Sequence, residues 1–180
     1  MISIHIMLWI FILLFAVIGA VRGWAKELLV TFSVILALFS QNVLQTFVPF
    51  FKEVMRESSP ATVFWIRTGI VSALVFFGYQ TPKLQRLAES GRFIRNVLQD
   101  TLLGGVLGAV NGYLVFGTVW FYLHTAEYPF AFVTAPDPAT ANGLAALTWI
   151  NYLPPSWLMG NPAIYFAVVI CFIFIVVVFI

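Results

Sequence analysis

The sequence predicts an all-α membrane protein, a polytopic helical bundle of about five spans. Hydrophobic residues make up 62% of the 180 residues and charged residues only 9%, whereas a soluble domain carries roughly 25% charged residues. The mean hydropathy is +1.00. The long apolar runs lack the alternation of a barrel strand, so they must cross the bilayer as helices whose backbone groups bond internally.

The spans follow from runs of roughly 20 apolar residues, the length needed to cross the hydrocarbon core. Residues 1–126 contain four such runs, at about 4–21, 28–51, 61–82 and 101–126, and we expect them to form a four-span core. A fifth, C-terminal span is expected at 163–180. No basic residue precedes Ile4, so the first run is interpreted as a spanning helix rather than a signal peptide.

The connection at 83–99 has apolar residues at helical spacing, and most of its charged residues lie off that stripe. This pattern predicts a basic interfacial helix on the membrane surface. Its partner is either anionic lipid, which attracts basic side chains at the cytoplasmic leaflet, or another protein that docks on it.

The segment 127–162 contains six prolines and no Lys or Arg. Its aromatic residues Tyr128, Trp149, Tyr152 and Trp157 are of the kind that settles at headgroup depth. We therefore expect a cap on the outer face that contains a short interfacial or re-entrant helix. A simple linker that follows the membrane surface is the alternative.

Basic residues are unequally divided between the two sides of this predicted topology. Six fall on one side and two on the other; the six are Arg22, Lys26, Lys83, Arg86, Arg92 and Arg95, and the two are Lys52 and Arg56. Because basic loops remain in the cytoplasm, the amino terminus is expected outside and the carboxyl terminus in the cytoplasm.

A glycine-rich face marks the span at 101–126. The residues predicted to pack closely against another helix are Gly104, Gly105, Gly108, Asn111 and Gly112. Glycines four apart let helix backbones approach, and an asparagine amide can bond across the helix pair. Asp100 stands where the N-cap of this span is expected. The partner is another helix of the chain, a second copy in a homo-oligomer, or a different membrane protein.

Three polar residues within or near the predicted spans need separate explanations. Arg67 is a charge inside the third span, where it either extends outward to headgroups or to Glu53 or Glu57, or contacts an anion or substrate. His5 and His124 lie near the outer ends of the first and fourth spans. Imidazoles can ligate haem iron or a pigment metal, but histidines near helix ends more often form interfacial hydrogen bonds, so no cofactor is expected.

Several function classes are disfavoured by what the sequence does not contain. There is no GxSxG, HExxH or phosphate-binding glycine motif, and no predicted span carries a carboxylate. A net charge of +2 without a basic run excludes a nucleic-acid surface. A catalytic function and an ion-driven transport function are therefore not expected.

Two blocks of the sequence resemble the colicin V production protein family. The first contains Arg22, Gly23, Lys26 and Glu27, and the second is the glycine-rich helix that follows Asp100. The resemblance covers roughly residues 2–123. It implies a bacterial inner-membrane protein linked to toxin export, without catalytic residues or a metal to carry over. The chain departs from the family pattern at His5, where an aspartate is common, and in its fifth span.

The functional expectation is a non-enzymatic helical scaffold in envelope maintenance or toxin secretion. The alternative is a small structural subunit of a larger respiratory or photosynthetic membrane complex, in which helix faces are buried against foreign helices or pigments. Either function would suit a chain with 19 phenylalanines and six tryptophans.

Overall fold

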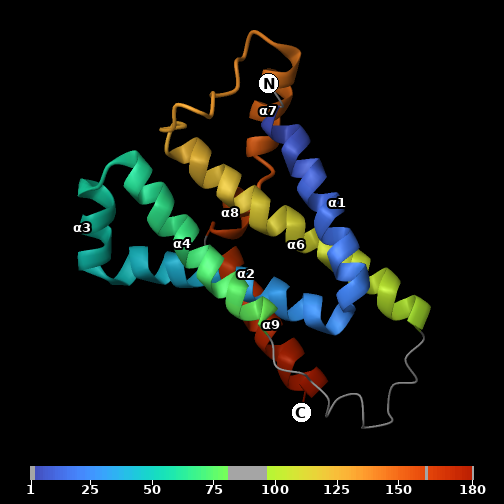
Figure 1. The fold of residues 1–180 in the computed structure, drawn as a ribbon. Helices are drawn as coiled ribbons and strands as arrows, with labels where there is room; N and C mark the ends of the chain where they lie inside the picture. The colour runs from blue at the N-terminus through green and yellow to red at the C-terminus, as the bar shows by residue number, and fades with distance from the viewer. Residues whose placement is uncertain (1–2, 81–96, 161, 180) are drawn as a thin grey trace.

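A computed structural model describes residues 3–80, 97–160 and 162–179, and every regular element in these ranges is helical. The helices are α1 (Ile4–Arg22), α2 (Trp24–Phe47), α3 (Pro49–Glu57), α4 (Pro60–Tyr79), α6 (Val97–Thr125), α7 (Ala141–Ile150), α8 (Pro154–Leu158) and α9 (Ala163–Phe179). Figure 1 shows α1 and α6 crossing near the end of α1, with α2 running between α4 and α9.

Four helices are long and apolar enough to cross a membrane, namely α1, α2, α4 and α6. A fifth crossing arises if the α7–α8 segment and α9 count as one span, which would be bent by 63°. The predicted class of an all-α polytopic membrane protein is therefore confirmed.

The buried core lies where α2, α4 and α6 meet. Val34, Val71 and Leu114 come from these three helices and belong to one cluster of buried side chains. A second cluster joins the amino-terminal half of α1 to α7 through Leu8, Trp120 and Ala146. The rings of Trp9 and Trp149 also pack edge to face there, with centroids 5.5 Å apart.

The second predicted span, 28–51, was wrong at both ends. Gly23 separates α1 from α2 with a φ of 86°, a left-handed conformation that glycine adopts at little cost. As a result, α2 starts at Trp24 and includes Glu27. At the other end α2 stops at Phe47, and Pro49 occupies the first turn of α3, where its missing N–H costs nothing.

Two further predicted segments differ from the structure. Residues 97–99 of the expected interfacial helix belong to α6, and the rest of that prediction, at 83–96, lies outside the described residues. The cap segment contains two short helices, α7 and α8. The Thr140 hydroxyl accepts a 3.0 Å hydrogen bond from the Gly143 N–H at the start of α7. Pro154 begins α8 and lies against Gly117 of α6.

Candidate functional site

The glycine face of α6 lies directly against α1. A methyl group added at Gly104 would overlap the Gly19 carbonyl oxygen, and one at Gly108 would overlap the Phe15 carbonyl oxygen. At Gly112 it would come within 2.8 Å of the Phe11 carbonyl oxygen. Gly105 differs, because its added methyl would meet Ala16 and Ala20 at an ordinary 3.6 Å. Of these four glycines, therefore, only Gly104, Gly108 and Gly112 are required for the backbones of α1 and α6 to approach this closely.

Asp100 was predicted as the N-cap of its own helix, and this prediction was wrong. It lies within the first described turn of α6, which already includes Val97. Its carboxylate instead accepts a 3.3 Å hydrogen bond from the backbone N–H of Trp24, the first residue of α2. Asp100 therefore caps a neighbouring helix, at the end where unpaired N–H groups and the helix dipole favour a negative charge.

Gly23 makes this contact possible. A side chain on Gly23 would come within 2.8 Å of both Asp100 carboxylate oxygens. The residue thus combines a left-handed turn between α1 and α2 with close packing under the Asp100 carboxylate.

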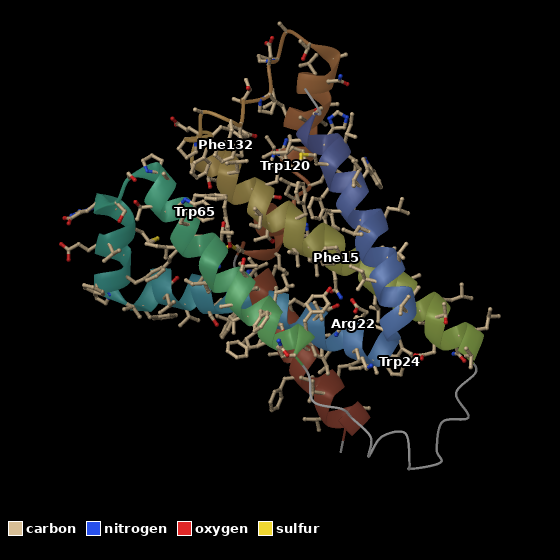
Figure 2. The ribbon with its side chains drawn as sticks, in the orientation of Figure 1. Phe15, Arg22, Trp24, Trp65, Trp120 and Phe132 are labelled. Carbon is tan, nitrogen blue, oxygen red and sulfur yellow. The ribbon has the colours of Figure 1, made fainter. Side chains whose placement is uncertain are left out.

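Among the charged residues that the structure describes, the most deeply buried is Glu27 of α2, whose side chain has no exposed surface. Arg22 at the end of α1 lies 2.9 Å from it, between Arg22 Nε and Glu27 Oε1. These two atoms form an ion pair rather than an aligned hydrogen bond. The Arg22 guanidinium also lies over the Tyr79 ring of α4, 4.3 Å from its centroid. Figure 2 shows Arg22 projecting from α1 toward α2 and α4.

Asn111 of α6 completes the surroundings of Glu27. Its Nδ2 donates to Glu27 Oε2 at 2.8 Å and to the Glu27 carbonyl oxygen at 2.9 Å. The Thr31 hydroxyl donates to Asn111 Oδ1 at 2.7 Å. We call Arg22, Glu27, Thr31, Tyr79 and Asn111 the Glu27 cluster. It joins four helices through polar contacts in a membrane protein, where an unpaired buried charge would be strongly unfavourable.

The burial of Glu27 was not predicted from the sequence, because the second span was expected to start at Leu28, one residue later. The sequence did contain a pattern that indicates this burial. Residues at helical spacing share the buried face of α2, namely Glu27, Val30, Val34, Ala37 and Gln41. Of the other residues in the same block, Lys26 is exposed.

Arg67 lies on α4, about two turns from its start at Pro60. The Gln41 amide of α2 donates to the Arg67 carbonyl oxygen at 3.2 Å, which sets the two helices in register. The Arg67 guanidinium lies 5.6 Å from the centroid of the Tyr122 ring of α6. We call Gln41, Arg67, Thr118 and Tyr122 the Arg67 cluster; Gln41, Thr118 and Tyr122 are buried in the core.

The two histidines occupy separate local settings. His5 Nδ1 and the Ser3 hydroxyl form a 2.8 Å hydrogen bond. The His124 ring meets the edge of Tyr128, with centroids 5.8 Å apart. Burial raises the pKa of the Tyr128 hydroxyl. No described interaction joins His5 to His124, and the described residues contain no group of three potential metal ligands.

One comparison with known proteins identifies the family. The sequence profile of the colicin V production protein family matches residues 4–136. No curated protein and no solved structure matches the chain. The profile covers α1 to α6, and with them both buried polar clusters, and it ends before α7. The chain therefore belongs to the colicin V production protein family.

Proposed function

We propose that this member of the colicin V production protein family is a non-enzymatic helical scaffold that supports toxin secretion or envelope maintenance in the bacterial inner membrane. One observation carries the proposal: Arg22 and Glu27, two of the three charged residues of the block that resembles the family, make contacts between helices. With Asn111 they join α1, α2 and α6 at the seam where the glycines let two backbones meet. In this proposal the charges hold the bundle together, and no substrate or cofactor uses them.

The scaffold function can be tested by replacing the ion pair without leaving a charge behind. A buried ion pair can often be exchanged for apolar residues of similar size at little cost, whereas removal of one partner strands the other charge. The double variant Arg22→Met/Glu27→Met should therefore retain toxin secretion, and Arg22→Met alone should lose it. Secretion is measured as toxin activity in the culture fluid of a producing strain that lacks its own copy of the protein.

The proposal fails if the double variant is produced and inserted like the parent but secretes no toxin. That result would mean that Glu27 or Arg22 acts chemically on something that passes through the membrane. Lys26→Met is the matched control, because Lys26 belongs to the same block and is exposed.

The alternative function, a subunit of a respiratory or photosynthetic complex, makes a different prediction. Such a subunit would migrate with larger, coloured partners after extraction in mild detergent. The scaffold proposal expects a small colourless species on native electrophoresis, either a single chain or a homo-oligomer. Comigration with a haem or pigment absorbance band would favour the alternative.

A further inference from the structure

Arg67 is a cation within a membrane span that lacks a counter-charge in the described part of the chain. The two ion pairs found there join Arg22 to Glu27 and Arg56 to Glu57. Glu53 and Glu57, the carboxylates toward which Arg67 was expected to extend, are exposed on α3. Arg67 instead faces the Tyr122 ring and is only partly exposed. A charge in such a place requires an anion or strong hydrogen bonding.

The surroundings of Arg67 contain buried polar atoms without hydrogen-bond partners among the described residues. Three belong to fully or almost fully buried side chains: Gln41 Oε1, Thr118 Oγ1 and the Tyr122 hydroxyl. Three more come from partly buried side chains: Gln45 Nε2, Arg67 Nε and Thr68 Oγ1. Unsatisfied groups are uncommon in protein interiors, so a concentration of them calls for an explanation.

The packing of three helices brings Gln41, Arg67 and Tyr122 together, since the Gln41 amide donates to the Arg67 carbonyl oxygen and the Arg67 guanidinium faces the Tyr122 ring. Gln45 lies one helical turn after Gln41 on α2, and Thr118 lies one helical turn before Tyr122 on α6. The Tyr122 ring lies 5.6 Å from the Arg67 guanidinium, measured to the ring centroid. Eleven residues nearer the other end of α4, Gly78 lies against Val30 and Ser33 of α2, as expected for antiparallel helices in the register set by Gln41 and Arg67.

All of these groups except Gln41 Oε1, which can only accept a hydrogen bond, have the chemistry of an oxyanion site. The guanidinium offers several N–H donors in a planar fork that suits phosphate oxygens. The hydroxyls of Tyr122 and Thr118 and the amide of Gln45 add neutral donors from two other helices. A tetrahedral phosphate accepts hydrogen bonds from more directions than a planar carboxylate does, and the donors here come from three helices. We propose that the Arg67 cluster binds a phosphate-class oxyanion, either free phosphate or the phosphate of a phospholipid headgroup.

The two sources are distinguished by two binding experiments on the purified full-length protein in a non-ionic detergent. In the first, binding of radiolabelled inorganic phosphate is measured by equilibrium dialysis. In the second, the protein is titrated with dioctanoyl phosphatidylglycerol and followed by native mass spectrometry, with dioctanoylglycerol, which lacks the phosphate, as the matched ligand control. We expect saturable binding of one ligand per chain in at least one experiment, and none of dioctanoylglycerol.

Variants connect the binding to the proposed residues. Arg67→Gln should weaken it by about tenfold or more, because a charged hydrogen-bonding partner is lost. Arg67→Lys keeps the positive charge but loses the planar set of N–H donors of the guanidinium, so it should weaken binding less. Arg56→Gln, at an exposed cation on α3, is the matched control and should bind like the parent.

Two milder variants keep the test decisive if Arg67→Gln does not fold, as judged by gel filtration. Tyr122→Phe and Thr118→Val each remove one hydroxyl with little change in volume, and each should weaken binding several-fold. The proposal is overturned if neither ligand binds saturably. It is equally overturned if the folded Arg67 and Tyr122 variants bind like the parent, because the oxyanion would then sit elsewhere.

Discussion

The two partners of the buried ion pair differ in their access to solvent, and this difference decides what each contributes. Glu27 has no exposed side-chain surface, whereas Arg22 at the end of α1 is 23% exposed. A stranded Arg22 could turn outward along its long aliphatic stem, as arginines near helix ends do. A stranded Glu27 has no such route. Removal of the arginine should therefore be the more damaging change.

Substitution at the ion pair tests this asymmetry directly. Arg22→Gln should lower the free energy of unfolding by about 3 kcal/mol, the cost of an uncompensated buried charge. Glu27→Gln should cost about 1 kcal/mol, because its amide oxygen can still accept from Asn111. Unfolding by a denaturing detergent, followed by helical circular dichroism, measures both. Equal losses for the two variants would show that Arg22 cannot reach solvent. Lys26→Gln is the control at an exposed position.

Asp100 is expected to stabilise the start of α2 rather than its own helix. Asp100→Ala removes the acceptor for the Trp24 N–H and should cost about 1 kcal/mol, as the loss of a helix cap does. Asp100→Asn retains an acceptor oxygen and should cost less. Hydrogen exchange at the first turn of α2 provides the readout. If exchange accelerates at the start of α6 and not of α2, the assignment of the cap is wrong.

At the scale of helices, the packing of α6 on α1 depends on backbone proximity rather than on large side chains. In lipid there is little hydrophobic force between helices, so close van der Waals contact and hydrogen bonds must hold them together. The glycines provide the contact, and Asn111 adds hydrogen bonds from the same helix to α2. Helix α6 therefore contacts α1 through backbone atoms and α2 through the side-chain amide of Asn111.

The close approach predicts opposite results for two glycines only three residues apart. Gly108→Ala places a methyl group on the Phe15 carbonyl oxygen and should destabilise the fold by about 1–3 kcal/mol, the usual cost of overpacking. Gly105→Ala meets its neighbours at 3.6 Å and should leave stability unchanged or slightly raised. The thermal unfolding temperature in detergent distinguishes them. Matching behaviour of the two variants would place the α1 contact on a different face of α6.

At the scale of the whole molecule, the part of the chain that follows the family match packs on α2 and α6, two helices inside that match. The part after residue 136 adds α7, α8 and α9. Gly117 of α6 receives Pro154 of α8, and Phe39 of α2 packs edge to face on Tyr165 of α9, with centroids 5.9 Å apart. The Asn42 amide donates to the Met159 carbonyl oxygen at 3.4 Å where the chain bends between α8 and α9. The C-terminal segment is therefore packed onto the helices that the family profile covers.

The predicted orientation can be tested with single cysteines introduced after Cys171→Ser. With the amino terminus outside, Ala139→Cys in the exposed segment before α7 should react with an impermeant maleimide added to intact cells. Gln80→Cys, exposed at the end of α4, should react only after the membrane is opened. The reversed pattern would invert the topology, since these two sites are joined by one crossing through α6.

The sequence by itself determined the fold class, the approximate spans and the glycine spacing on α6. These features depend on composition and on local helical periodicity, which survive without knowledge of any partner helix. The ends of the second span were misjudged because Gly23 and Pro49 act through single backbone conformations, whereas the prediction rested on hydropathy averaged over many residues.

Only the tertiary structure decided which polar residues meet. Glu27 and Asn111 are 84 residues apart in the chain and bond at 2.8 Å, and Asp100 caps a helix that begins 76 residues earlier. Likewise, Gln41, Arg67 and Tyr122 come together only because three helices pack in one register. A contact between distant residues depends on how helices rotate and cross, and local periodicity contains no information about either.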